Sequence, residues 1–330
     1  MQRVLVTGGL GFIGSHFIEL LLSKGYYVIN IDKKTYLSRE DLDFDKNKNY
    51  ELILKDINDI RVLPADISHI VNFAAESHVE DSIVDSTNFV RTNINGVHNL
   101  LELVRELPPD KRPVFVHIST DEVYGDIADG TFSESDRLHP SSPYSATKAA
   151  ADQLVIAWAR THGLKVRICR SSNNYGYGQH GTKLIPNTMK RAIKGHKALI
   201  HGHGKYTREW TFVGDNCHAT YLVMTKGKDG EIYNISSGDE RENLAVVRAV
   251  LRVMGKSEDH IEYGADRPGQ DVRYALKTDK IRALGWEPTM TLEQYLPICK
   301  ERNEERTRKM GPGKKKELLR LLGLEKLFHA

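Results

Sequence analysis

Short runs of β-branched and other apolar residues alternate with longer amphipathic segments through the first half of the chain. Short apolar runs predict buried strands, whereas apolar positions three or four residues apart predict helices that cover a sheet. The predicted strands are residues 3–7, 27–31, 51–55, 69–73, 114–119 and 165–170, and the predicted helices are residues 14–24, 92–106 and 143–162. This order predicts an α/β fold, a doubly wound parallel sheet with helices on both faces and right-handed crossovers.

The pattern changes after about residue 171. Gly, His, Asn and Tyr cluster between Ser171 and Gly204, which is typical of a loop-rich binding surface rather than of regular sheet. Short helices and strands follow, of which residues 243–254 are the clearest helix. We therefore expect the second half to be organised differently from the first.

Composition excludes several classes of protein. The chain has 330 residues, of which 40% are hydrophobic, so it can bury a core and is not a disordered chain. Its three cysteines, Cys169, Cys217 and Cys299, are widely spaced, which disfavours a disulfide scaffold and favours a reducing compartment. No apolar run reaches the ~18 to 20 residues that span a bilayer, and the sequence begins with a strand rather than a signal peptide. These features predict a cytoplasmic globular protein.

The formal net charge of +3 is concentrated at the C-terminal end. Residues 300–330 contain ten Lys or Arg and five Asp or Glu, which leaves −2 for residues 1–299. A nucleic-acid-binding protein needs a basic face on its folded domain, so this distribution argues against that class. Leucines among the basic residues of segment 314–328 suit an amphipathic helix, either on a membrane surface or packed on its own domain or on a subunit.

A glycine-rich turn follows the first predicted strand. Gly8, Gly11 and Gly14 form a GxxGxxG turn that opens the first helix, where free backbone N–H groups favour a diphosphate. Such turns also occur for purely structural reasons, but here the second strand ends at Asp32, whose carboxylate can bind ribose hydroxyls. The pattern predicts dinucleotide binding, with NAD favoured over NADP. Lys33 and the lysine that follows it could instead accommodate a 2′-phosphate, or be simply solvated.

Two further motifs carry candidate chemistry. Tyr144 and Lys148 lie one helical turn apart at the start of a predicted helix, and an ammonium there would lower the pKa of the tyrosine. A Tyr-x-x-x-Lys pattern is common by chance. The segment Ser119-Thr120-Asp121-Glu122-Val123-Tyr124-Gly125 adds a hydroxyl and two adjacent carboxylates at the end of a predicted strand. These could be a solvated acidic turn or a proton donor and a proton acceptor that act on one substrate.

Together these motifs resemble the extended short-chain dehydrogenase/reductase superfamily, which has a Rossmann fold. Within it, the sequence is similar to the nucleotide-sugar 4,6-dehydratases of the dTDP-glucose 4,6-dehydratase type. The resemblance runs from residue 2 to about residue 296. Its supporting segments are AAESHV at 74–79, YSATKA at 144–149, RSSNNYG at 170–176, KLIP at 183–186, REW at 208–210 and DRPG at 266–269.

The resemblance implies a three-stage reaction without net redox change, on a nucleotide-diphosphate sugar with bound NAD. Tyr144 takes the proton of the sugar 4-hydroxyl while hydride leaves C4, and Thr120 holds the 4-oxygen. Glu122 then removes the acidified C5 hydrogen while Asp121 protonates the departing 6-hydroxyl. Hydride returns to C6 and gives the 4-keto-6-deoxy sugar. Thr120, Asp121, Glu122, Tyr144 and Lys148 are thus the expected catalytic residues.

Binding residues follow from the same resemblance, position by position. The expected cofactor-binding residues are Gly8, Gly11, Phe12, Ile13, Gly14, Asp32, Lys33, Asp56, Ile57, Ala74, Ala75, Thr92, Tyr144, Lys148 and Asn174. The expected substrate-binding residues are Ser77, Thr120, Asn173, Lys183, Leu184, Arg208, Asn243, Asp266 and Arg267.

Some of these residues have simpler interpretations. Arg208 suits a diphosphate bidentately, but it could form a surface ion pair with Glu209. The two asparagines at 173 and 174 could cap turns, and Asn243 could be the N-cap of the helix after it. Histidines 196, 201, 203 and 218 lack the spacing of a metal site, so we expect no metal.

The nucleotide pocket departs from the pattern of the family. Residues 175–183 read YGYGQHGTK, without the usual proline and the Phe-Pro-Glu before the lysine. His201 stands where a tyrosine is usual, and Gln270 where a histidine closes the DRPGH segment. The nucleotide therefore stays open: dTDP-glucose is the default, and a UDP-sugar is the alternative.

Other functions of the same fold compete with dehydration. A 4-epimerase or a UDP-glucuronate decarboxylase shares the fold, the tyrosine and the lysine, but does not normally carry the Asp-Glu pair, so Asp121 discriminates. A non-catalytic NAD-binding protein would be expected to lose Tyr144, Lys148 or the carboxylates, all of which are present.

The resemblance also implies a domain organisation. Residues 1–170, joined by roughly 211–235, would form the NAD-binding Rossmann domain. Residues 171–210 and 236–330 would form a smaller C-terminal α/β domain for the nucleotide sugar, which ends in the basic tail. The active site would lie in the cleft between them, and the family is typically homodimeric, through a bundle formed by residues 92–106 and the Tyr144 helix.

Overall fold

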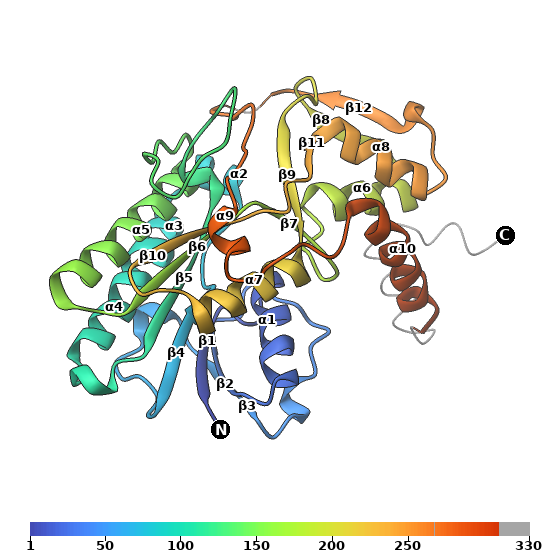
Figure 1. The fold of residues 1–330 in the computed structure, drawn as a ribbon. Coiled ribbons are helices and arrows are strands. Elements are labelled where there is room, and N and C mark those ends of the chain that lie inside the picture. The colour runs from blue at the N-terminus through green and yellow to red at the C-terminus, as the bar shows by residue number, and fades with distance from the viewer. Residues whose placement is uncertain (267, 310–330) are drawn as a thin grey trace. The chain divides into compact units, whose positions relative to one another are not determined.

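A seven-stranded parallel sheet, in the order β10-β6-β5-β4-β1-β2-β3, forms the centre of the first part of the molecule (Figure 1). In this computed structural model, residues 1–266 and 268–309 are described. The strands of this sheet are β1 (Arg3–Thr7), β2 (Tyr27–Asp32), β3 (Tyr50–Leu54), β4 (Ile67–Asn72), β5 (Val114–Thr120), β6 (Val166–Ser171) and β10 (Glu231–Ile235). The predicted doubly wound sheet is confirmed, and the ends of the six predicted strands differ by two residues or fewer.

The strand order reverses direction next to β1. The chain runs outwards from β1 through β2 to β3, then returns to β4 on the other side and continues outwards through β5 and β6. At such a switch point the loops after neighbouring strands separate and leave a crevice at the carboxyl ends of the strands, where ligands bind in open α/β sheets. The candidate site residues after β1, β2, β4 and β5 are therefore brought to one edge of the sheet.

Helices cover both faces of this sheet. Helices α1 (Phe12–Ser23) and α7 (Val213–Lys226) contact each other, and their apolar side chains form one core cluster with those of the strands. On the opposite face, α4 (Val97–Glu106) and α5 (Pro143–His162) bury residues such as Leu100 and Val155 in a second cluster. The short helices α2 (Val79–Val84), α3 (Thr87–Phe89) and α9 (Asp279–Arg282) and the 3₁₀ turns η1 (Phe44–Lys46), η2 (Ile57–Asp59), η4 (Pro109–Lys111) and η5 (Asp121–Val123) complete this part.

The helix predicted at residues 92–106 is divided in the structure. Its first part belongs to a π-helical segment, η3 (Val90–Gly96), and α4 begins only at Val97. Such π-helical segments are rare and occur frequently at functional sites. Here the segment carries Thr92 and Asn93, both buried.

The chain forms two compact units. Unit 1 contains Met1–Asn174, Arg208–Glu240 and Gly269–Thr289, and unit 2 contains Tyr175–Thr207, Arg241–Pro268 and the described part of Met290–Ala330. The chain passes from one unit to the other within strands β7 (Asn173–Tyr175), β9 (Thr207–Phe212) and β11 (Glu240–Glu242), which form a three-stranded sheet in the order β11-β9-β7.

Residues 269–289 belong to unit 1, whereas the resemblance implied that they belong to the second domain. Residues 171–174, 208–210 and 236–240 also lie in unit 1 rather than in the second domain. For residues 269–289 the physical reason lies in two contacts. Leu276 forms a parallel bridge with Phe132 and donates its backbone N–H to Glu209. Trp286 is fully buried and donates its indole N–H to the carbonyl of Asp215.

Unit 2 is a small α/β unit. Strands β8 (Ala198–His201) and β12 (Ile261–Gly264) pair in parallel, and helices α6 (Leu184–Ile193) and α8 (Asn243–Val253) pack around them, with η6 (Glu258–His260) and α10 (Leu292–Lys309). Helix α6 lies within the stretch expected to be loop-rich, because Ile185, Met189 and Ala192 recur at helical spacing and are buried.

The basic tail analysed at 314–328 lies outside the described residues. Within the described part of the chain, no helix is long and apolar enough to cross a membrane.

Candidate active site

The glycine turn after β1 leaves no room for side chains. Gly8 has a φ of +70°, and a Cβ on it would lie 2.6 Å from the backbone nitrogen of Ala74. A Cβ on Gly14 would lie 2.4 Å from the carbonyl oxygen of Gly8. Gly11 precedes α1 without a side-chain cap, so the first N–H groups of the helix are available to an anion. The turn therefore fits the diphosphate of a dinucleotide.

Asp32 ends β2 beside this turn. Its Oδ2 accepts from the backbone N–H of Leu10 at 2.9 Å and its Oδ1 from that of Lys34 at 2.8 Å. Burial raises its pKa, and these two hydrogen bonds and the Lys33 charge oppose that rise. The side chain is thus fixed at the rim of the turn with lone pairs left over for ribose hydroxyls.

Lys33 is held by acidic residues of unit 1. Its Nζ lies 2.9 Å from Glu76 Oε1 and 3.8 Å from Asp56 Oδ2, and it donates to the hydroxyl of Thr92 at 3.3 Å. Two carboxylates around one ammonium leave little positive charge for a 2′-phosphate. This arrangement favours NAD over NADP.

Two other expected cofactor residues of unit 1, Asp56 and Ala74, also lie just after strands of the sheet, β3 and β4. Ala74 follows β4 and donates its N–H to Thr7, while Asp56 caps η2 by accepting from the N–H of Asn58. A Cβ on Gly96 of η3 would lie 2.4 Å from Ile57, so η3 packs closely on the residue after Asp56.

The Asp-Glu pair forms the turn η5 directly after β5. The Thr120 hydroxyl donates to Asp121 Oδ1 at 3.0 Å and accepts from the backbone N–H of Glu122 at 3.3 Å. Asp121 is 1% exposed, and its Oδ2 has no hydrogen-bond partner among the described residues. Burial and the charge of Glu122 raise the pKa of Asp121 well above its ordinary value. The protonated form of Asp121 is therefore favoured more than that of an exposed carboxyl, and Oδ2 is the oxygen that the Thr120 hydroxyl does not contact.

Tyr144 and Lys148 lie in the first turns of α5. Ser142 caps this helix through a capping box with Ser145, and Pro143 occupies its first turn. Burial and the charges of Glu122 and Asp121 raise the pKa of Tyr144, while a hydrogen bond with Thr120 opposes the rise.

The direction of this pKa shift is opposite to the sequence prediction. Lys148 Nζ donates to the carbonyl of Ile118 at 2.6 Å, and burial lowers its own pKa to about 8. Burial and the charges of Glu122 and Asp121 raise the pKa of Tyr144. Their effect outweighs that of the Lys148 ammonium, which is bound to the carbonyl of Ile118.

The expected substrate residues of unit 1 have different local roles. Arg208 is 6% exposed, donates to the carbonyls of Asp271 at 2.8 Å and Val272 at 3.3 Å, and stacks on Tyr274, 4.2 Å from the ring centre. Glu209 accepts instead from Leu276, so the two neighbours in β9 have different partners. Ser77 lies in the loop after β4, and the two asparagines at 173 and 174 lie in β7, where the second donates to the carbonyl of Ser172.

Four expected substrate residues are described in unit 2. Lys183 precedes α6 and Leu184 begins it, while Asp266 accepts a hydrogen bond from the hydroxyl of Tyr206. Asn243 is the first residue of α8, and Glu242 is its N-cap, so the N-cap interpretation of Asn243 is wrong. Arg267 lies outside the described residues.

Sequence reasoning missed several groups near the acidic turn. The hydroxyls of Ser141 and Tyr274 both donate to Asp271 Oδ2, and the charge of Glu122 contributes to a raised pKa of Tyr274. Glu209 is 4% exposed, and burial raises its pKa to about 7. No clear signal in the sequence points to these groups, because Glu209 lies in a strand of mixed polar and apolar residues, TREWTF.

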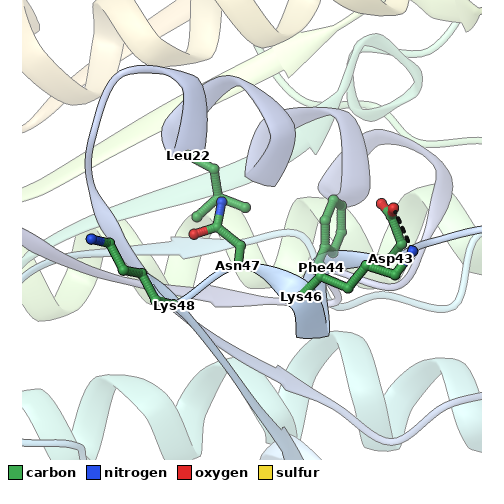
Figure 2. Close-up of a pocket in the computed structure, with 6 residues that line it drawn as sticks. All are labelled: Leu22, Asp43, Phe44, Lys46, Asn47 and Lys48. Carbon is green, nitrogen blue, oxygen red and sulfur yellow. Dashed lines mark hydrogen bonds and ion pairs between the residues drawn. The ribbon is translucent and has the colours of Figure 1, made fainter.

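A shallow pocket of about 500 Å³ lies elsewhere on unit 1, and Figure 2 shows its lining. It is formed by Leu22, Asp43, Phe44, Lys46, Asn47 and Lys48. Lys46 pairs with Asp43 at 3.2 Å. Leu22 lies ~15 Å along α1 from Phe12, at 1.5 Å per residue, so this pocket is remote from the glycine turn. Among the residues described here, no group of three His, Cys, Asp or Glu is arranged to hold a metal.

Comparison with known proteins decides the family. The sequence model of the GDP-mannose 4,6 dehydratase family matches residues 5–298. The chain belongs to this family. It is 46% identical over 302 residues to the low-salt glycan biosynthesis protein Agl12 of Haloferax volcanii, with 90% of this chain and 96% of that protein covered.

Proteins named dTDP-glucose 4,6-dehydratase are also similar to this member of the GDP-mannose 4,6 dehydratase family. The one from Haemophilus influenzae is 44% identical over 327 residues, with 90% of this chain and 96% of that protein covered. A crystal structure of the Streptomyces venezuelae enzyme with NAD bound has a TM-score of 0.86 and 37% identity, covering 92% of this chain and 98% of that one. The resemblance seen in the sequence is thus confirmed.

Proposed function

We propose that this chain is a nucleotide-sugar 4,6-dehydratase with tightly bound NAD. It would convert a nucleotide-diphosphate hexose, by default dTDP-glucose, into the 4-keto-6-deoxy sugar and water. The observation that carries the proposal is the turn η5. There, Asp121 is buried with a raised pKa, and it and its neighbour Glu122 follow the Thr120 hydroxyl, which is hydrogen-bonded to Tyr144.

The residues of unit 1 fit NAD. The crowded glycine turn would hold the diphosphate, Asp32 the adenosine ribose, and Tyr144 and Lys148 the nicotinamide end. Bound NAD supplies a hydride acceptor, a hydride donor after reduction, and a positive charge in its oxidised form.

Each catalytic side chain has one proton task. Tyr144 has to be a phenolate to accept the proton of the sugar 4-hydroxyl. Its hydrogen bond with Thr120 favours the phenolate, and the positive charge of oxidised NAD beside it would offset the raised pKa described above. Loss of hydride from C4 leaves a ketone, which acidifies the hydrogen on C5. Glu122 removes that proton while Asp121 gives its own proton to the departing 6-hydroxyl, so that water leaves and a double bond forms between C5 and C6. Return of the hydride to C6 and of a proton to C5 then gives the 4-keto-6-deoxy sugar.

The environments of the two carboxyls divide these roles. Burial and the negative charge of Glu122 raise the pKa of Asp121, which suits Asp121 to act as the acid while Glu122 acts as the base. A 4-epimerase does not expel the 6-hydroxyl of its substrate, so it needs no acid to protonate that hydroxyl. The raised pKa of Asp121 therefore favours dehydration over epimerisation.

The nucleotide is proposed from the relatives and from the pocket residues. Relatives named dTDP-glucose 4,6-dehydratase support dTDP-glucose. His201 and Gln270, which depart from the family pattern, make a UDP-sugar the alternative.

The test is mass spectrometry of the products after incubation with dTDP-glucose, UDP-glucose, UDP-N-acetylglucosamine, GDP-mannose and CDP-glucose, each alone. Loss of one water from one substrate supports the proposal and identifies the nucleotide. An unchanged mass with a new chromatographic peak would instead show an epimerase. An unchanged substrate with NAD bound would favour the non-catalytic binding protein.

We also propose that the chain forms a homodimer through α4 and α5, together with α2 and η3, which contact α5. Apolar side chains are exposed there: Val84 is 88% and Val90 is 41% exposed. Sedimentation should show a dimer for the natural chain and a weakened dimer for Val90→Glu. A monomer at micromolar concentration contradicts this proposal.

A further inference from the structure

A connected set of buried polar side chains lies beneath Lys148. This buried network consists of Thr7, Asn72, His117, Asp152 and Arg170, from β1, β4, β5, α5 and β6. None is more than 1% exposed. Buried polar groups are costly unless they are paired, and no step assigned above uses these five residues.

Hydrogen bonds in the network fix the tautomer of His117. The Thr7 hydroxyl accepts from Ala74 N at 3.4 Å and donates to Asn72 Oδ1 at 2.5 Å. The amide nitrogen of Asn72 then faces His117 Nδ1 at 3.2 Å, and because this nitrogen only donates, Nδ1 must accept. The proton of the neutral ring is therefore on Nε2.

His117 Nε2 stands between Lys148 and Asp152. It lies 3.5 Å from Lys148 Nζ and 3.8 Å from Asp152 Oδ1. A protonated Nε2 cannot accept from Lys148, which explains why the ammonium donates to Ile118 O instead. The ring keeps the carboxylate from forming a direct ion pair with Lys148, while the charge of Asp152 still acts across it.

Asp152 is shared between two buried cations. Arg170 Nε donates to Asp152 Oδ2 at 2.8 Å, whereas Asp152 Oδ1 has no hydrogen-bond partner among the described residues. Arg170 and Lys148 each carry a positive charge, Asp152 carries one negative charge, and His117 is neutral. This part of the core therefore has one uncompensated positive charge. The position of Asp152 between Arg170 and Lys148 decides how that charge is distributed.

We propose that Asp152 and Arg170 are positioning residues that set the charge of Lys148 in opposite directions, with His117 as the neutral spacer between Asp152 and Lys148. Asp152 favours the ammonium form. Arg170 opposes the ammonium form of Lys148, because it pairs with the same Asp152 carboxylate. The relevance to turnover rests on the proposed function, but the charge state of Lys148 is a property of the folded chain.

The ionisable groups around Lys148 agree with this assignment. On α5 these are Tyr144 and Asp152, on β5 His117, on β6 Arg170, and on η5 the two carboxyl groups that act on Tyr144. Burial lowers the pKa of Lys148 to about 8 and Asp152 opposes that shift, while burial and the two cations hold the pKa of His117 well below its ordinary value.

The test is an NMR pH titration of Lys148 in the full-length protein with its cofactor. Lysine is labelled with ¹³C, and the Lys148 signal is assigned by its loss in Lys148→Met. We expect Asp152→Asn to lower the titration midpoint by about one pH unit or more, and Arg170→Gln to raise it, because a nearby buried charge shifts a pKa by roughly one to three units. Arg167→Gln is the matched control: it removes a cation from the same strand, but one that pairs with Asp229, and it should not move the midpoint.

Two results would overturn the assignment: midpoints that do not move in either variant, or midpoints that move in the same direction. If Asp152→Asn does not fold, Arg170→Gln against Arg170→Lys decides, since the lysine variant keeps the charge and should titrate as the natural chain does. The alkaline limb of the pH profile of kcat should shift in the same direction as the titration midpoint of Lys148. A chain without dehydratase activity would fail the kinetic arm alone, which separates the failure of the proposed function from the failure of this inference.

Discussion

At the scale of single residues, the acidic turn shows how neighbouring side chains of similar chemistry acquire different roles. Asp121 is 1% exposed at the end of a buried strand, and its pKa is raised by burial and by Glu122. Sequence alone placed both carboxyls beside the tyrosine. The resemblance implied that Asp121 is the acid, but the residues themselves could not show why its pKa is raised, because that depends on burial by residues far away in the chain.

Asp121→Asn tests the division of roles. The amide keeps the shape but cannot give a proton to the leaving hydroxyl, so we expect hydride transfer from C4 to survive and water loss to fall by about 10² to 10⁴. Reduced cofactor should then accumulate, which its absorbance reports in a single turnover. Glu122→Gln is the comparison and should also accumulate reduced cofactor, whereas Tyr144→Phe should not. Unchanged water loss in Asp121→Asn would contradict the role of the acid.

Glu209 should make stability depend on pH. Burial raises its pKa from 4.5 to about 7, so its contribution is present when it is protonated and is lost as the pH rises through 7. Relative to Glu209→Gln, the natural chain should lose up to about 3 kcal/mol of unfolding free energy between about pH 4.5 and about pH 8.5. Urea unfolding at both pH values measures this. Parallel losses in the two proteins would show that Glu209 is not the group responsible.

At the scale of elements, α5 is positioned by signals at its two ends. Ser142 and Ser145 form a capping box at the start, and Gly163 ends the helix with a φ of 67°. These signals were readable in the sequence, and the predicted bounds of this helix are confirmed. The N-terminal end matters most for the site, because Tyr144 and Lys148 follow the cap within two turns.

Ser142→Ala and Gly163→Ala form a matched pair. Each should lower the free energy of unfolding by about 1 kcal/mol, the first through a lost cap and the second through strain at positive φ. Only Ser142→Ala should also lower kcat, because the cap lies beside Tyr144. Urea unfolding and initial rates check both, and equal effects on kcat would mean that the start of the helix has no special role.

At the scale of the whole molecule, unit 1 is completed by a segment that returns late in the chain. Gly269–Thr289 contributes Trp286, which is fully buried and donates to the carbonyl of Asp215. Thr289 adds two hydrogen bonds to the carboxylate of Asp215, at 2.9 Å and 2.6 Å. The same segment positions Arg208, because the carbonyls of Asp271 and Val272 accept hydrogen bonds from its guanidinium.

Trp286→Ala should destabilise the protein by about 3–5 kcal/mol, because it leaves a large cavity and an unpaired carbonyl. Thermal unfolding followed by circular dichroism measures the effect. Trp158, which is partly buried on α5, is the matched control, and Trp158→Ala should cost less. Equal losses in the two variants would mean that the returning segment does not stabilise unit 1.

The sequence by itself determined the elements and the local chemistry: the strands, the glycine turn, the capped helix with Tyr144 and Lys148, and the Asp-Glu pair. These depend on periodicity and on residues close in the chain, so they can be read without knowing the fold. Only the tertiary structure decided the raised pKa values of Asp121 and Tyr144, the return of residues 269–289 and the network around His117. Those properties depend on burial and on charges from distant segments, and low-dielectric surroundings arise only when strands and helices are packed together.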